Sequence, residues 1–148
     1  MTASLKQEIG QILMLAARDF QRRLAQDLTE RGISGVNSRQ RNVILHLGQF
    51  GASRSVDLAE AAGIRPQSMM KVVHELEQMG LVERRADPSD SRAKLIDFTR
   101  KGERFIGELS ASTETVWHQY REKIDNEQLI QAFTTLKQLT ETDSRSER

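Results

Sequence analysis

Residues 55–102 read SVDLAEAAGIRPQSMMKVVHELEQMGLVERRADPSDSRAKLIDFTRKG, and they contain the most informative pattern in the chain. One run with helical periodicity begins at Ser55 and ends at Gly63, and a second begins at Pro66 and ends at Gly80. Proline is well tolerated at the first helical position, and glycine commonly ends a helix in the left-handed conformation. The pattern predicts two short helices joined by a tight turn, with Ser55 as the N-cap of the first. This arrangement is a helix-turn-helix.

The two predicted helices have an apolar face at the spacing that helix packing requires. It consists of Leu58, Ala62, Ile64, Met69 and Val72. The side chains left outside this face, on the second helix and its entry, are candidates for contacting DNA: Arg65, Pro66, Gln67, Ser68, Met70, Lys71 and His74.

The candidate contacts differ in what their chemistry allows. Gln67 falls in the first turn, where a major-groove helix presents base-reading residues, and glutamine can pair with adenine. Ser68 suits a base or a phosphate, whereas Lys71 and Arg65 suit phosphate. For each residue taken singly, an ordinary solvated position on a surface helix explains it equally well.

A β-hairpin is predicted to follow the helix pair. The strand-like runs 81–84 and 94–98 flank residues 86–92, which are rich in turn-forming residues. This spacing predicts a hairpin with a long polar tip. Thr99 is expected to cap the next helix.

Further helices are predicted on both sides of this segment. A long amphipathic helix covers the N-terminal residues and ends at Gly32, and another starts at Asn37, with Gln40 as its capping-box partner. Asp125 caps a last helix, and the polar tail from Thr142 is expected to fray. The predicted order is four helices, a hairpin and two helices.

These residues resemble the DNA-binding domain of the MarR family of transcriptional regulators. Residues 66–84 are similar to that family's recognition helix and following strand. The more specific match is Asp87-Pro88-Ser89-Asp90-Ser91-Arg92 before Phe98-Thr99 and Gly102, because the family's wing has an Asp-x-Arg pair followed by a hydrophobic-Thr-x-x-Gly step. The flanking helices match in number and order, so the resemblance covers almost the whole chain.

The resemblance implies a mostly α fold, an α+β winged helix within a single domain of residues 1–148. Residues 37–102 would form the DNA-binding lobe, and residues 1–31 and 103–142 the dimerisation helices. Apolar stripes on these terminal helices also favour a dimer, although they could instead close an intramolecular core.

The resemblance also implies roles for the wing residues. Arg92 would enter or approach the minor groove, and Asp90 would hold its guanidinium in a charge-assisted hydrogen bond. Arg84, with Arg85 and Lys94, would attract the DNA backbone. An exposed ion pair of little energetic value is the alternative for the pair Asp90 and Arg92.

Two positions depart from the family pattern. Arg65 stands where the family often has a small hydroxyl residue that caps the recognition helix, and the loss of such a cap costs about 1 kcal/mol. Ser91 stands where the family often has a second basic residue, which weakens the expected electrostatic attraction of the wing.

The resemblance further implies a homodimer that binds a pseudo-palindromic double-stranded operator, with repression as the commoner family mode. Many family members release DNA when a small aromatic or phenolic effector binds, so such an effector is a candidate partner. Candidate pocket walls are Met14, Phe20, Phe50 and Trp117, although an ordinary core position is the favoured interpretation of each. The residues do not define the operator, the regulated genes or the effector.

Composition argues against other classes of protein. The chain has no cysteine, which excludes thiol catalysis and disulfides, and its three histidines lack a metal-ligand spacing, so neither a metal nor a cofactor is expected. It contains no nucleophile elbow, phosphate loop or His-Glu-x-x-His run, so it is not expected to be an enzyme. The longest apolar cluster, 12–17, is too short to cross a membrane, and no signal-peptide layout is present, so a cytoplasmic location is expected.

The charge distribution is uneven. Residues 32–104 hold twelve basic and nine acidic side chains, whereas residues 105–148 hold five basic and eight acidic ones. This difference favours an anionic partner for the central region, although a solvated charged surface also explains it. The remaining rival function is a winged-helix protein-interaction module without DNA binding, which Met69 and Met70 leave open.

Overall fold

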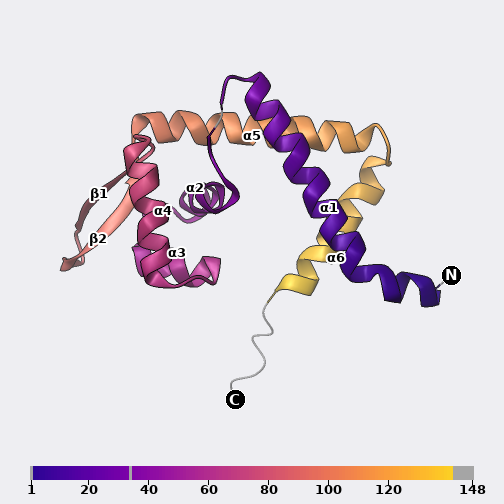
Figure 1. Cartoon of the computed structure of the whole chain (residues 1–148), viewed down its shortest axis with the longest axis horizontal. Helices are drawn as coiled ribbons and strands as arrows, with labels where there is room; N and C mark the ends of the chain where they lie inside the picture. Colours follow the sequence, from indigo (N-terminus) through magenta and orange to yellow (C-terminus); the bar gives the residue numbers. More distant parts are fainter. Residues whose placement is uncertain (1, 34, 142–148) are drawn as a thin grey trace, which may run out of the picture. The chain divides into compact units, whose positions relative to one another are not determined.

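The computed structural model describes residues 2–33 and 35–141, so the tail predicted to fray from Thr142 lies outside the described residues. Within these residues, six helices and one antiparallel hairpin follow one another (Figure 1). In order they are α1 (Thr2–Glu30), α2 (Ser38–Phe50), α3 (Ser55–Ala62), α4 (Pro66–Gln78), β1 (Val82–Asp87), β2 (Asp90–Phe98), α5 (Arg100–Arg121) and α6 (Asn126–Thr140). None of the described helices combines the length and the apolar character that a membrane span needs. The predicted element order and the mostly helical winged fold are confirmed.

The chain divides into two compact units. The first comprises Met1–Leu24 with Ser112–Arg148, and the second comprises Ala25–Ala111. The helix-turn-helix and the hairpin both belong to the second unit, and each unit has its own buried side chains.

The connection between α1 and α2 follows the sequence prediction. Gly32 has φ 79°, and the Ile33 N–H donates to the Leu28 carbonyl at 2.8 Å, which satisfies a carbonyl at the end of α1. The Asn37 side chain accepts from the Gln40 N–H at 2.9 Å, and the Gln40 side chain accepts from the Asn37 N–H at 3.0 Å. The predicted capping box is therefore present.

The core of the second unit lies among α2, α3, α4 and the hairpin. Its most buried large side chains include Ile44, Leu58, Met69, Leu76 and Ile96. Val72 is also buried and Ile64 is half-buried, as predicted for the packed face, but the expectation that Ala62 is buried is wrong. Ala62 is exposed because it lines an open pocket between α2 and α3.

The start of α3 also differs from the prediction. Its N-cap is Arg54, and Ser55 is the first helical residue. The Ser53 N–H and carbonyl both bond to Ile96, at 3.0 and 2.8 Å, which keeps the chain extended up to this point. The Arg54 carbonyl then accepts from the Leu58 N–H at 3.1 Å. The helix therefore begins at Ser55, one residue earlier than it would if Ser55 were the N-cap.

The hairpin has a shorter tip than predicted. Asp87 pairs with Asp90, which leaves Pro88 and Ser89 as the tip residues, where the sequence predicted a loop of residues 86–92. Ala86 pairs with Lys94, so residues 91–93 form an irregularity in β2 opposite the step from Ala86 to Asp87. The turn-forming side chains in this segment satisfy backbone groups of the strand ends, and they do not build a long loop.

The junction between the hairpin and α5 explains the Thr-x-x-Gly step. The Thr99 N–H donates to the Leu81 carbonyl at 3.1 Å, its hydroxyl donates to the Gly80 carbonyl, and the same hydroxyl accepts from the Gly102 N–H at 3.1 Å. A Cβ on Gly102 would overlap the Leu81 carbonyl oxygen. Thr99 therefore caps α5 as predicted, and glycine is required three residues later by this close approach.

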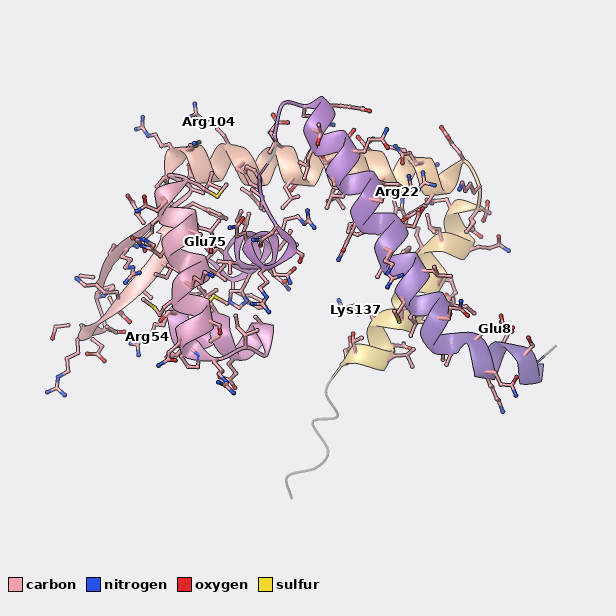
Figure 2. The ribbon with its side chains drawn as sticks, in the orientation of Figure 1. Glu8, Arg22, Arg54, Glu75, Arg104 and Lys137 are labelled. Carbon is pink, nitrogen blue, oxygen red and sulfur yellow. The ribbon has the colours of Figure 1, made fainter. Side chains whose placement is uncertain are left out.

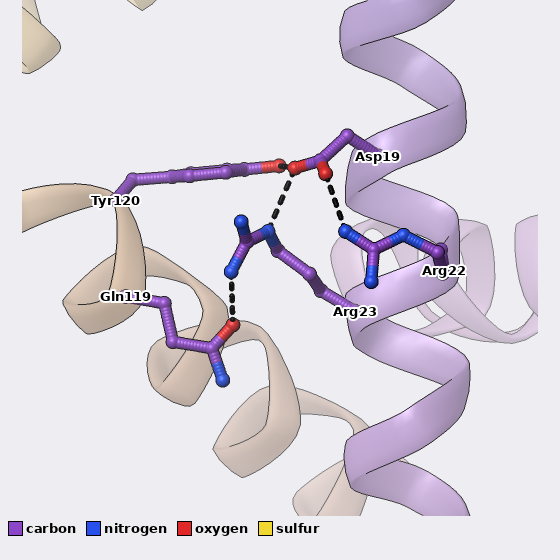
Figure 3. Close-up of polar contacts among 5 residues, drawn as sticks. All are labelled: Asp19, Arg22, Arg23, Gln119 and Tyr120. Atoms are coloured by element: carbon purple, nitrogen blue, oxygen red, sulfur yellow. Dashed lines mark hydrogen bonds and ion pairs between the residues drawn. The ribbon is translucent and has the colours of Figure 1, made fainter. Parts of the chain in front are cut away.

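In the first unit, polar contacts join α1 to α5 (Figure 3). Asp19 accepts from Arg22 and Arg23, both at 2.7 Å, and from the Tyr120 hydroxyl at 3.0 Å, while Arg23 also donates to Gln119 at 2.9 Å. These bonds, led by the one from Arg23, lower the pKa of Asp19 to about 2.

The ends of α5 and α6 complete the first unit. Asp125 accepts from the Glu127 N–H at 3.1 Å and caps α6 as predicted. Ile124 lies beyond the end of α5 and is exposed. Trp117 of α5 packs against Phe133 of α6 with ring centroids 5.7 Å apart.

Candidate nucleic-acid interface

The outward face of α4 carries the side chains that the sequence singled out. Gln67, Lys71 and His74 are exposed, and Ser68 and Met70 are half-buried. The opposite face is fixed by buried side chains of the helix: Met69, Val72, Val73 and Leu76. Because successive turns of a helix repeat about every 3.6 residues, these buried anchors determine which way the polar residues point.

The N-terminus of α4 has no side-chain cap among the described residues. Arg65 is the N-cap residue, with φ −65° and ψ 145°, and Pro66 occupies the first helical position, as predicted. The N–H groups of the first turn are therefore free of a side-chain acceptor, and the positive end of the helix dipole lies beside the exposed Arg65. This end of α4 is suited to an anion such as a phosphate.

A contact that sequence reasoning missed ties α4 to α2. Gln40 is buried, and its side-chain NH₂ donates to Glu75 at 2.8 Å while its oxygen completes the capping box of α2. The capping pattern identified Gln40, but nothing in the spacing indicates a partner thirty-five residues away.

Arg92 lies on the surface of the wing, as expected, but its contact with Asp90 differs from the expected one. Arg92 is exposed within the irregular segment of β2. Asp90 accepts from the backbone N–H of Arg92 at 2.9 Å, and no ion pair in residues 2–33 and 35–141 joins the two side chains. The expected bond from Asp90 to the guanidinium is therefore wrong, since the carboxylate instead satisfies an N–H that the irregularity leaves without a strand partner.

Two of the wing arginines are engaged by neighbouring carboxylates. Arg84 Nε lies 2.8 Å from Glu77, and an Arg85 NH₂ group lies 3.0 Å from Asp97. In the part of the chain that the structure describes, no ion pair involves the exposed cations Arg65, Lys71, Arg92 and Lys94. Among the described residues, unpaired positive charge therefore lies on the entry to α4, on α4 and on β2, and the second unit also has basic residues without an ion pair on α2 and at the start of α5.

A second carboxylate of the wing is Asp87. The sequence indicated it only as part of the wing motif and gave it no role of its own. It is buried and accepts from the Ser89 hydroxyl at 2.7 Å, the Ser89 N–H at 2.9 Å, and Arg54 at 2.6 and 2.8 Å. The bonds from Ser89, followed by that from Arg54, lower the pKa of Asp87 to about 2. The Asp-x-Ser spacing could have indicated the local turn, but no local pattern indicates Arg54.

The second unit also contains a pocket of about 330 Å³ between α2 and α3. It is lined by Asn42, Val43, Leu45, His46, Gln49, Phe50, Leu58, Ala61, Ala62 and Met69. The rings of His46 and Phe50 lie 4.7 Å apart at one side of it. Of the four predicted pocket walls, Phe50 belongs to this pocket, whereas Met14, Phe20 and Trp117 do not line it.

No group of three or more potential metal ligands occurs among the described residues. The helix pair α3 and α4 and the hairpin that follows it define the class of the protein, a winged helix-turn-helix. Comparison with known proteins adds a similarity to a family.

Residues 34–93 match the model of the MarR family. A MarR-family regulator from Rhodococcus sp. RHA1 is 26% identical, with 91% of this chain and 94% of that chain covered and a TM-score of 0.74. CouR from Rhodococcus jostii RHA1, solved bound to p-coumaroyl-CoA, is 27% identical over 91% of this chain and 93% of its own, with a TM-score of 0.73. A MarR family protein from Bacillus stearothermophilus shares the fold, with a TM-score of 0.76, 21% identity and coverage of 94% and 95%. Over residues 34–93 the chain is thus similar to the MarR family of transcriptional regulators, and its fold is that of solved MarR-family proteins.

Proposed function

We propose that this chain is a cytoplasmic homodimeric repressor that reads a pseudo-palindromic operator with α4 and holds the adjacent minor groove with Arg92. The observation that carries the proposal is the outward face of α4, where Gln67, Ser68 and Lys71 lie together above a buried apolar face. Gln67 suits a base edge, and Lys71 and Arg65 suit phosphates near the uncapped helix end.

The remaining proposed contacts surround this centre. Pro66 and Met70 border Gln67 on α4, and His74 lies about two turns further along the helix. Arg84, Asp90 and Arg92 come from the hairpin. Arg84 is expected to contribute less than Arg92, because its charge is already engaged by Glu77. The proposed role of Asp90 is to fix the backbone at Arg92.

Dimerisation is proposed through the terminal helices, residues 1–31 and 103–142. On α1, Leu5, Ile9 and Leu13 expose between 44% and 58% of their surface, and on α6 Phe133 and Leu139 expose 47% and 69%. Monomeric proteins rarely leave large contiguous apolar patches in water. A second copy of the chain is the proposed partner for these faces.

A direct experiment on assembly is sedimentation equilibrium at micromolar concentration, where twice the chain mass of 16.8 kDa is expected. Ile9→Asp should shift the equilibrium toward monomer, because it places a charge on the apolar stripe. Lys6→Asp adds the same carboxylate at a polar position of the same helix and is the matched control. A folded monomer for the unaltered chain would contradict the proposal.

Specific DNA binding is tested by selecting duplexes from a random-sequence library and measuring the affinity of the enriched sequence by fluorescence anisotropy. Enrichment of an inverted repeat with half-sites about one helical turn apart is expected. The rival function, a protein-interaction module, predicts no enrichment and binding that does not depend on sequence. Repression is then tested by placing the selected duplex across a promoter in transcription assays in vitro.

A small aromatic effector is the last part of the proposal. Its support is the solved complex of CouR with p-coumaroyl-CoA and the pocket beside Phe50, whose volume is in the range of ligand sites. Titration of p-coumarate and p-coumaroyl-CoA into the complex with the selected duplex should release DNA. Failure of these and other simple phenolic compounds would remove the effector and leave DNA binding in place.

A further inference from the structure

The outer end of the wing is attached to the start of α3 by a side-chain contact that local sequence pattern does not encode. Arg54, the N-cap residue of α3, is labelled in Figure 2. It reaches Asp87 at the end of β1 with Nε at 2.8 Å and an NH₂ group at 2.6 Å. The Asp87 side chain is 6% exposed and that of Arg54 is 37% exposed. We call this contact the Arg54–Asp87 latch.

The latch complements a second attachment of the same hairpin. Ser53 bonds through its backbone to Ile96, near the inner end of β2. The outer part of the hairpin needs such support, because an isolated two-stranded hairpin is at best marginally stable. Neighbouring residues 53 and 54 therefore hold the hairpin at two points, one near its base and one near its tip.

The latch lies next to the segment that carries Arg92. Asp87 pairs with Asp90, and the three following residues, 91–93, form the irregular part of β2. Asp87 also closes the tip by accepting from the N–H and hydroxyl of Ser89. One carboxylate thus joins the tip to α3, while Asp90 fixes the backbone of Arg92 from the other side of the turn.

We propose that Arg54 and Asp87 are positioning residues for DNA binding, which hold the outer wing and thereby Arg92 at a fixed place relative to the helix-turn-helix. This inference rests on the proposed function of Arg92. Holding a flexible cation in place before binding reduces the conformational entropy that binding removes, which raises affinity without a new contact.

The first test does not involve DNA. In Asp87→Asn, the amide can still accept from Ser89 but no longer pairs with a charge on Arg54, so the amides of residues 89–92 should gain mobility in ¹⁵N heteronuclear NOE measurements. Asp97→Asn is the matched control. Asp97 also pairs with a wing arginine, Arg85, and also accepts a backbone N–H, that of Phe98. Unchanged NOE values in Asp87→Asn would overturn the latch even if no duplex were found.

The second test uses the duplex that the unaltered chain enriches from the random library. Asp87→Asn and Arg54→Gln should each weaken binding about five- to tenfold, and Asp97→Asn less than twofold. In an Arg92→Ala background, Asp87→Asn should cause no further loss of affinity, although it should lower the melting temperature as it does in the unaltered chain. A merely stabilising pair would lower affinity equally in both backgrounds, and that result would overturn the positioning role.

The same titrations distinguish the latch from a phosphate contact by Arg54. If Arg54 binds a phosphate, Arg54→Gln should lower the slope of log affinity against log salt by about 0.9, and Asp87→Asn should leave affinity unchanged or raised. The latch predicts that both variants weaken binding, and that Arg54→Lys restores part of the affinity lost in Arg54→Gln. Failure to enrich any duplex would contradict the proposed function, whereas the NOE measurement would still decide whether the latch holds the wing.

Discussion

The recognition helix and the wing belong to the same compact unit, yet they are held in place by different means. The orientation of α4 follows from its own periodicity, because Met69, Val73 and Leu76 are buried and the polar residues between them must face outward. The position of Arg92 depends on bonds from Asp90, on the irregularity in β2, and on Arg54 from a distant part of the chain. The comparison indicates that the orientation of α4 does not change when a single polar residue is substituted, whereas the position of the wing depends on a few side chains.

The largest expected effect would disturb both regions at once. Gly102→Ala should destabilise the folded state by roughly 2–4 kcal/mol, because the added methyl group overlaps the Leu81 carbonyl at the junction of hairpin and α5. Thermal denaturation followed by circular dichroism measures the effect. Gly107→Ala is the matched control on the same helix, where an added Cβ meets no atom within 4 Å. Equal melting temperatures for the two variants would contradict the close approach.

The next effect separates the wing from the recognition helix. Arg92→Ala should weaken binding to the selected duplex by about tenfold to a hundredfold and leave the melting temperature unchanged, since Arg92 is exposed. Asp90→Ala should give a smaller loss, and the double variant should resemble Arg92→Ala. Anisotropy titrations of the four proteins form the cycle, and additive losses would mean that the two residues act independently.

Within α4, two substitutions distinguish a contact to a single base pair from a contact to phosphate. Gln67→Ala should cost roughly 1–3 kcal/mol of specific binding and relax preference at one base pair in each half-site. Lys71→Ala should weaken binding to all sequences and flatten the salt dependence. If both variants lose only non-specific affinity, Gln67 is not a base-reading residue.

The smallest expected effect is a change in the stability of the folded protein at low pH. Asp87 has a pKa of about 2 in the folded protein, against 3.8 in the unfolded chain. Its contribution to stability is therefore complete above about pH 4 and declines as the pH falls toward 2. The difference in melting temperature between the unaltered chain and Asp87→Asn should be constant from pH 7 to pH 5 and shrink below pH 4. A difference that already shrinks between pH 7 and pH 5 would contradict the low pKa.

Much of the fold follows from local sequence. The helix ends at Gly32 and Gly63, the capping box at Asn37, the proline start of α4 and the cap at Thr99 are all set by residues within a few positions of one another. Such local hydrogen bonds and backbone preferences do not depend on the rest of the molecule. The outward residues of α4 were predictable for the same reason.

The tertiary structure decided the features that join distant segments. Ser53 is held extended by Ile96, which moved the start of α3 away from the predicted cap at Ser55. Arg54 fixes Asp87 across thirty-three residues, and Gln40 reaches Glu75 across thirty-five. A side chain with several hydrogen-bonding atoms can satisfy them locally or at a distance, and only packing of the whole unit brings the distant partner within reach. The sequence by itself therefore determined which residues α4 presents, and the tertiary structure determined how the wing is held beside them.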